Sequence, residues 1–180
     1  MTTVRIDVTL PDDLAEALAR SGLPASSLCE RALEQALRRV TALRSGDVEL
    51  PNWTARARTA LRLATQRTDS AVTTADVLHG VLTEGTNLAV RLLPPLGDAP
   101  LGPEDAVPQW SGPALAALEL AHAEAAGLGH NYVGCEHLLL GLLAEPSGRA
   151  GEFLRARGLD LASFRAAVVA ALAGFTHARG

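Results

Sequence analysis

The sequence predicts a mainly α-helical protein in two parts, in which a small strand-helix-helix segment precedes a helical unit that occurs twice. Three observations support this fold class. Apolar residues recur at helical spacing over most of the chain. Residues 54–98 recur in degenerate form as residues 111–160, which indicates an internal repeat. Residues 3–10 alternate between apolar and polar side chains, as in a half-buried strand.

The first segment, residues 1–44, starts with the predicted strand Thr3–Leu10. Pro11 ends this strand and, with two aspartates after it, starts a helix that should stop at Ser21-Gly22. A second amphipathic helix is expected to begin at Ser26 or Ser27 and to continue to Val40. One strand and two helices cannot bury their apolar faces alone, so this segment needs a partner.

The order of these elements resembles the ribbon-helix-helix fold of small bacterial repressors and antitoxins, in which two chains pair their strands into a ribbon that enters the DNA major groove. The resemblance implies a homodimer through residues 1–44. By position, Arg5, Asp7 and Thr9 would face bases and Ser26 would meet a phosphate.

Two features depart from that pattern: the first helix is shorter than usual, and Asp7 is an acid where phosphates crowd. The segment also holds six arginines and six acids, so it has no net positive field. The alternative is a dimerisation ribbon without a role in DNA binding.

Residues 45–52 lack periodicity and are interpreted as a linker. Trp53 starts the second domain, residues 53–174, and residues 175–180 form a tail. In the internal repeat, Trp53-Thr54 pairs with Trp110-Ser111, and the run from Val72 to Leu82 pairs with the run from Val133 to Leu143. Residues 94–113 are rich in Pro and Gly and are predicted to be the loop between the repeats.

The stretch Gly127–Leu143, GLGHNYVGCEHLLLGLL, joins a polar loop to an apolar helix. Cys135 is expected at the cap position, with Glu136 in the first turn at the positive end of the helix dipole. The stretch resembles the GHNYIGTEHLLLGL signature of the N-terminal substrate-receptor domain of Clp unfoldases of the ClpA/ClpC type. This resemblance covers about residues 53–174 and implies an all-α, pseudo-two-fold bundle of two four-helix units.

The resemblance also implies a binding site. In phosphoarginine-binding members of that family, a glutamate just inside a helix start takes the guanidinium, and a threonine after an aromatic residue holds the phosphate. The matching residues in the second repeat are Glu136 and Ser111. In the first repeat Thr54 is kept, but Ala75 stands at the glutamate position, so at most one competent site is expected. The alternative is that Glu136 is only a helix-start residue.

The resemblance further implies a shallow apolar groove beside the matching aromatic residues, Trp53 and Trp110. In the family this groove binds peptides and, in actinobacterial ClpC, cyclic-peptide antibiotics of the cyclomarin type. We expect Trp110 to lie at such a groove, whereas Trp53 is expected to pack against the first helix of its repeat.

The composition excludes several other classes of protein. All 16 basic residues are arginine, so no P-loop lysine exists and a Clp-type receptor domain without an ATPase motor is expected. The net charge of −4 argues against a general nucleic-acid coat. No membrane-span or signal pattern is present, and only two cysteines occur, which favours a soluble protein of a reducing cytoplasm. The arginine, alanine and leucine content suggests a high-GC bacterial genome.

Catalytic, cofactor and metal sites are not expected. No Ser-His-Asp or paired-carboxylate arrangement stands out. The spacing of four potential ligands fits no common zinc pattern; these are His122, His130, Cys135 and His137.

Three functional hypotheses follow. The first is a non-catalytic protein that binds peptides, degrons or cyclic-peptide antibiotics, acts as a decoy or adaptor for the ClpC protease system, and represses its own gene in response to a ligand. The second is a DNA-binding transcription regulator whose Clp-like domain senses a small ligand. The third is a structural partner that docks on a Clp motor.

Overall fold

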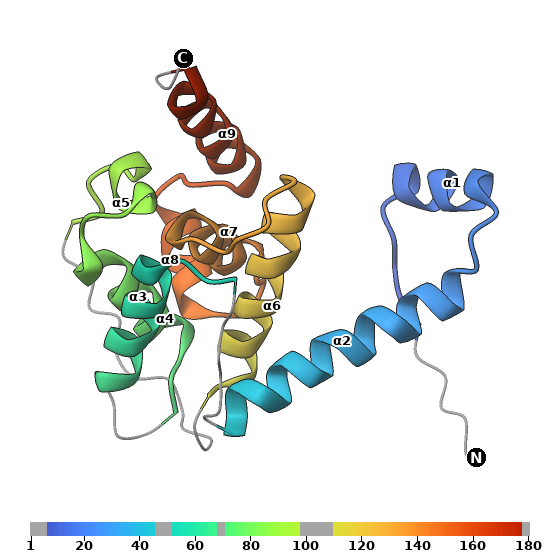
Figure 1. The fold of residues 1–180 in the computed structure, drawn as a ribbon, viewed down its shortest axis with the longest axis horizontal. Helices are drawn as coiled ribbons and strands as arrows, with labels where there is room; N and C mark the ends of the chain where they lie inside the picture. Colours follow the sequence, from blue (N-terminus) through green and yellow to red (C-terminus); the bar gives the residue numbers. More distant parts are fainter. Residues whose placement is uncertain (1–6, 46–51, 68–70, 98–109, 178–180) are drawn as a thin grey trace. The chain divides into compact units, whose positions relative to one another are not determined.

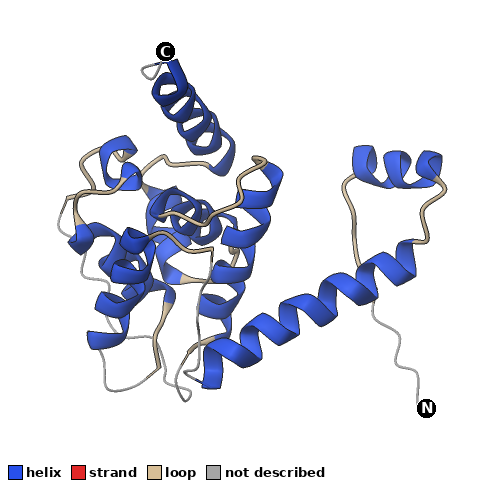
Figure 2. Cartoon of the chain, viewed as in Figure 1, coloured by secondary structure: helices blue, strands red, loops and turns tan. Residues whose placement is uncertain are grey.

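The computed structural model describes residues 7–45, 52–67, 71–97 and 110–177. These residues form nine α-helices and no β-strand (Figure 2), in agreement with the predicted fold class. The chain divides into two units, residues 1–41 and 42–180.

The first unit contains α1 (Asp12–Ser21) and most of α2 (Ala25–Ser45), which continues to the predicted linker. Helix α1 ends as predicted, because Gly22 adopts the left-handed conformation with φ +65°. Helix α2 begins earlier than predicted, because the carbonyl of Pro24 accepts its first helical hydrogen bond, from Leu28 N at 3.1 Å. Ser26 therefore lies inside the first turn.

The predicted strand Thr3–Leu10 is not supported. Residues 3–6 lie outside the described residues, and Asp7–Leu10 has no regular structure. A strand forms only through backbone hydrogen bonds to a neighbouring strand, and the described part of this chain contains no other strand. Alternation in the sequence therefore marks a segment able to pair, but it does not provide the partner.

The second unit contains both repeats, and their helices lie close together in Figure 1. The first repeat comprises α3 (Ala55–Gln66), α4 (Thr74–Glu84) and α5 (Leu88–Leu92). The second repeat comprises α6 (Gly112–Gly127), α7 (Cys135–Ala144), α8 (Arg149–Ala156) and α9 (Leu161–His177). The predicted four-helix unit is therefore found in the second repeat, whereas the described part of the first repeat has three helices.

Helix α7 lies at the centre of the core and is buried on all sides. It packs on α6 and also contacts α3, α4, α5, α8 and α9. The approach of α7 to α6 requires Gly141, since a Cβ there would clash with the carbonyl of Ala117 and lie 2.7 Å from Ala121 N. Gly80 has the same role where α4 meets α3, against the backbone of Ala60.

Two isolated parallel β-bridges connect the repeats, one between Trp53 and Val133 and the other between Val72 and Trp110. In the first bridge, Thr54 N donates to the carbonyl of Val133 at 3.0 Å; in the second, Ser111 N donates to that of Val72 at 2.9 Å. The first helix of each repeat therefore starts beside the second helix of the other repeat.

Candidate functional site

A cavity of about 200 Å³ lies where the starts of α3 and α7 meet α5 and α9. Its polar lining combines one carboxylate, two guanidinium groups and a hydroxyl with smaller polar and apolar groups. The lining residues are Thr54, Arg56, Asn87, Leu88, Arg91, Cys135, Glu136 and Leu172. The cavity therefore offers groups of both charges within one small space.

Thr54 caps α3 and is one of the residues that line the cavity. Its Oγ1 accepts a hydrogen bond from Ala57 N at 3.2 Å, which satisfies one of the free N–H groups at the helix start. A hydroxyl that accepts this bond still has its own proton to donate. The half-buried Thr54 can therefore stabilise the helix and bind an acceptor at the same time.

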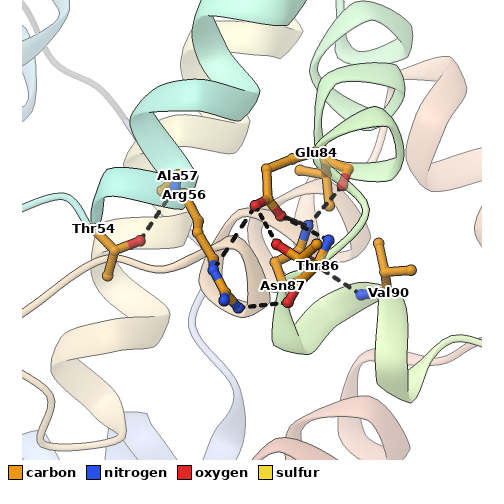
Figure 3. A network of polar contacts seen from close by, with 8 residues as sticks. Thr54, Arg56, Ala57, Glu84, Thr86, Asn87 and Val90 are labelled. Carbon is orange, nitrogen blue, oxygen red and sulfur yellow. Dashed lines mark hydrogen bonds and ion pairs between the residues drawn. The ribbon is translucent and has the colours of Figure 1, made fainter.

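Arg56 is held at the edge of the cavity by a polar network between α3 and the turn before α5 (Figure 3). Its guanidinium donates to the carbonyl of Thr86 and lies 3.8 Å from Glu84 Oε1. Burial alone would raise the pKa of Glu84, but hydrogen bonds from Thr86 and Asn87 and the charge of Arg56 outweigh burial and lower it. The ionised Glu84 thus orients Arg56, whose side chain stays 58% exposed.

Glu136 is the buried carboxylate of the cavity, and only 6% of the residue is exposed. Burial raises the pKa of Glu136, which indicates a carboxylate that lacks a fully compensating charge. His137 Nδ1 lies 3.5 Å from Glu136 Oε1, but burial lowers the pKa of His137 to about 4, so this ring is neutral at pH 7. None of the described arginines forms an ion pair with Glu136.

The start of α7 differs from the prediction. Gly134 is the cap residue, and its N–H donates to His137 Nδ1 at 2.9 Å. Cys135 is the first helical residue and is 1% exposed, so the prediction that it caps the helix was wrong. Burial and the nearby charges of Glu84 and Glu136 raise the pKa of the Cys135 thiol to about 12. This thiol is therefore protonated and unreactive.

The loop before α7 is held by stacked rings. His130 Nδ1 lies 2.8 Å from His137 Nε2, and the His130 and Tyr132 rings stack with centroids 5.2 Å apart. Through these contacts, the polar residues of the signature, His130, Tyr132 and His137, support the start of α7. Among the described residues, no cluster of three or more His, Cys, Asp or Glu could hold a metal ion.

The structure brings Glu136 together with Thr54 at the cavity, and not with Ser111 as the resemblance implied. Ser111 is 5% exposed, caps α6 by accepting from Ala114 N at 3.2 Å, and does not line this cavity. The crossed bridges place Ser111 beside the start of α4, where Ala75 is fully buried. Each site of this type therefore takes its hydroxyl from one repeat and its helix-start residue from the other.

The two tryptophans lie outside the cavity lining. Trp53 is 3% exposed in the core, and its Nε1 donates to His122 Nε2 at 3.2 Å. Trp110 is half-buried and packs against the core beside its bridge to Val72. Of the two tryptophans, Trp110 is the one that is partly exposed to solvent, because Trp53 is enclosed.

The residues that the ribbon-helix-helix resemblance assigned to DNA lie in the first unit. Arg5 is outside the described residues, and the other three are exposed; these are Asp7, Thr9 and Ser26. No helix within the described ranges is long and apolar enough to cross a membrane.

Sequence reasoning missed several residues of the cavity, above all Arg91 on α5 and Leu172 on α9. Both come from helices outside the signature that pointed to Glu136. A comparison of charges along the two repeats would have found Arg91, because the equivalent position in the second repeat is Glu152.

Comparisons with known proteins support the predicted resemblance to Clp N-terminal domains. Residues 111–180 match the Clp repeat (R) N-terminal domain family. The chaperone protein ClpC2 of Oryza sativa subsp. japonica chloroplasts is 37% identical over 123 residues, which are 61% of this chain and 13% of that protein. The ClpA homolog of Guillardia theta, an ATP-binding subunit of the ATP-dependent Clp protease, is 38% identical over 112 residues, 54% of this chain and 14% of that subunit.

The fold also resembles that of a solved structure. The N-terminal domain of the chaperone ClpD from Arabidopsis thaliana aligns with a TM-score of 0.50 and 18% identity, covering 71% of this chain and 98% of that domain. The chain thus spans nearly all of an isolated N-terminal domain but only a small part of the full-length relatives.

Proposed function

We propose that this chain, whose second unit carries a Clp repeat N-terminal domain, is a non-catalytic binding protein of the Clp protease system that takes phosphoarginine side chains into the cavity between Thr54 and Glu136. One observation carries the proposal: a buried carboxylate and an exposed guanidinium line the same small cavity. A ligand that matches this pair must carry a cation and an anion side by side.

Phosphoarginine has that pattern of charge. Its guanidinium would bind the carboxylate of Glu136 through charge-assisted hydrogen bonds. Its phosphoryl group would accept from the Thr54 hydroxyl, from Arg56 and from the N–H groups at the start of α3. The aliphatic stem of the ligand would pass between Leu88 and Leu172, which form the apolar walls.

Calorimetric titration of the full chain with a phosphoarginine peptide tests this proposal. Glu136→Ala should weaken binding by roughly 1.5–3 kcal/mol, or about one to two decades in affinity, because a charge-assisted contact is lost. Glu152→Ala is the matched control, since it removes an exposed carboxylate of α8 outside the cavity. Equal affinity of wild type and Glu136→Ala for the peptide would mean that Glu136 has a purely structural role.

Within the Clp system, the protein would act as a decoy or as an adaptor. A reconstituted ClpC protease degrading an arginine-phosphorylated substrate distinguishes the two roles. A decoy slows degradation by sequestering the substrate, whereas an adaptor accelerates it. Glu136→Ala should abolish either effect, and an unchanged effect would show that the cavity is not involved.

The first unit supports a second proposal, in which the protein is a homodimer and a ligand-responsive repressor. None of the described side chains in residues 7–38 is buried, and leucines remain exposed on both helices, among them Leu14 at 51%, Leu33 at 52% and Leu37 at 64%. A segment without a buried core is not stable by itself, so a second copy is its natural partner.

Gel-shift titration with promoter fragments tests the DNA-binding part of this second proposal. Arg5→Ala should abolish sequence-specific retention while the dimer persists, since an arginine-guanine pair contributes roughly 1–3 kcal/mol. If Arg5→Ala retained the promoter fragments as wild type does, the first unit would have a role in dimerisation only.

Cyclic-peptide antibiotics would use a different surface, centred on Trp110. Trp110→Ala should weaken an apolar cyclic peptide, whereas Glu136→Ala should leave its affinity unchanged. Calorimetric titration of both variants decides this point. If only Glu136→Ala weakened the binding of the cyclic peptide, the peptide would bind in the cavity and not at Trp110.

A further inference from the structure

Arg91 is the second cation of the cavity. It lies on α5, is exposed, and lines the cavity with Thr54 and Arg56. Arg91 makes no hydrogen bond or ion pair with any other residue that the structure describes. Its charge is therefore available to a ligand.

The charge of Arg56, in contrast, is already shared. Its guanidinium donates to the carbonyl of Thr86, and the ionised Glu84 lies 3.8 Å from it. A phosphoryl group carries about −1.5 to −2 charges at pH 7, whereas a carboxylate carries one. The single charge of Arg56 matches a carboxylate, whereas a doubly charged group is better matched by two guanidinium groups.

The equivalent place across the pseudo-two-fold axis lacks this pattern. By repeat position, Pro113 replaces Arg56 and Glu152 replaces Arg91. The carboxylate position is also lost there, because Ala75 replaces Glu136. The two arginines and the carboxylate thus occur together at one site and are absent together at the other, as expected if they bind one ligand.

We infer that Arg91 and Arg56 form an anion clamp in which Arg91 makes the cavity selective for phosphorylated over unmodified arginine. This inference rests on the proposed function and deepens it. Arg91 acts in two ways: it attracts the doubly charged phosphoryl group, and it repels the guanidinium of an unmodified arginine on Glu136. The cavity would therefore detect the modification, and not only the side chain that carries it.

The test uses the full chain and two peptides that differ only in phosphorylation of one arginine. Affinities are measured by calorimetry for wild type, Arg91→Gln, Arg91→Lys and the control Arg62→Gln. Arg62 is an exposed arginine of α3 whose guanidinium donates to Gln66 Oε1 at 3.0 Å, outside the cavity. Circular dichroism confirms that each variant is folded.

Arg91→Gln should lower the affinity for the phosphorylated peptide by roughly tenfold or more, as expected for the loss of a charge-assisted contact. Its affinity for the unmodified peptide should stay equal or rise, because a repulsive charge is removed. Arg91→Lys should keep much of the selectivity, since the positive charge remains. Arg62→Gln should match wild type for both peptides.

Three results would overturn the clamp. Equal loss of affinity for both peptides would mean that Arg91 has only a structural role. Unchanged selectivity in Arg91→Gln would refute the clamp and leave the proposed function intact. Failure of the wild-type chain to bind the phosphorylated peptide would refute the proposed function and the clamp with it.

Discussion

The backbone N–H of Thr54 donates a hydrogen bond of 3.0 Å to the carbonyl of Val133. This bond connects the cap of α3 in the first repeat to the loop that leads into α7 in the second. Glu136 consequently lines the same cavity as Thr54. Because the cavity takes residues from both repeats, neither repeat could form it alone.

Two cap substitutions should separate helix capping from ligand binding. Thr54→Ala and Ser111→Ala each remove a side-chain acceptor at a helix start, and each should lower the free energy of unfolding by about 1 kcal/mol. Only Thr54→Ala should also weaken a phosphoarginine peptide, because Ser111 lies outside the cavity. Denaturant unfolding and calorimetric titration of both variants measure the two effects. If Ser111→Ala weakened the binding of the peptide and Thr54→Ala did not, Ser111 and not Thr54 would share the site with Glu136.

The free energy of unfolding should fall on acidification from pH 6.5 towards 4 because of His137. Burial lowers the pKa of His137 from 6.5 to about 4, so in this window the unfolded chain binds a proton that the folded chain rejects. The free energy of unfolding keeps its full value above pH 6.5, and protonation of His137 in the unfolded chain lowers it by ~3 kcal/mol at most. Glu136 opposes this trend near the acid end, because its pKa is raised and protonation favours the fold.

His137→Asn provides the control for this pH dependence. Its Oδ1 could accept the hydrogen bond from Gly134 N, but an amide does not titrate. Denaturant unfolding from pH 7.5 to 4 should show a flatter profile for this variant than for wild type. Parallel profiles would assign the acid sensitivity to other groups.

Gly141→Ala should destabilise the second unit by about 1–3 kcal/mol or more, because the added methyl group would force α7 away from α6. The new Cβ would lie 2.7 Å from Ala121 N and even closer to the carbonyl of Ala117. Gly112→Ala is the control, because a Cβ there meets no atom within 4 Å. Thermal unfolding compares the two, and equal midpoints would show that the helices adjust without cost.

The combined substitutions Leu33→Glu and Leu37→Glu should convert a homodimer into a monomer. Both leucines are more than half exposed on α2, and charges there would oppose burial against a second copy. Val169→Glu is the control, since Val169 is 50% exposed on α9 in the other unit. Light scattering of the full chain measures the mass of each variant. A monomeric wild type, or a dimer that survives both charges, would contradict the role of this face.

Much of the fold could be predicted because its determinants are local. Helical spacing of apolar residues indicated the mainly α class, and the position of Gly22 indicated where α1 ends. The internal repeat indicated a pseudo-symmetric unit, and the signature around Glu136 marked a carboxylate at a helix start. Each of these inferences needs only residues that are close in sequence, where spacing and chemistry determine the result.

The cap of α7 and the predicted strand were less predictable. Gly134, rather than Cys135, is the cap residue of α7, because the side chain of Cys135 packs in the core. The alternation in Thr3–Leu10 could not reveal whether a pairing strand is present. Both outcomes depend on what surrounds a residue in space, which local spacing does not specify.

The sequence by itself determined that Glu136 is a helix-start carboxylate, that Ala75 breaks the symmetry of the repeats, and that at most one competent site of this kind is to be expected. Only the tertiary structure decided that Thr54 shares the cavity with Glu136, and that Arg91 joins them from α5. The physical reason is the crossed backbone pairing of the repeats, since each bridge connects residues far apart in the chain. Such contacts form when the helices pack on α7, and the spacing of residues within one helix does not predict them.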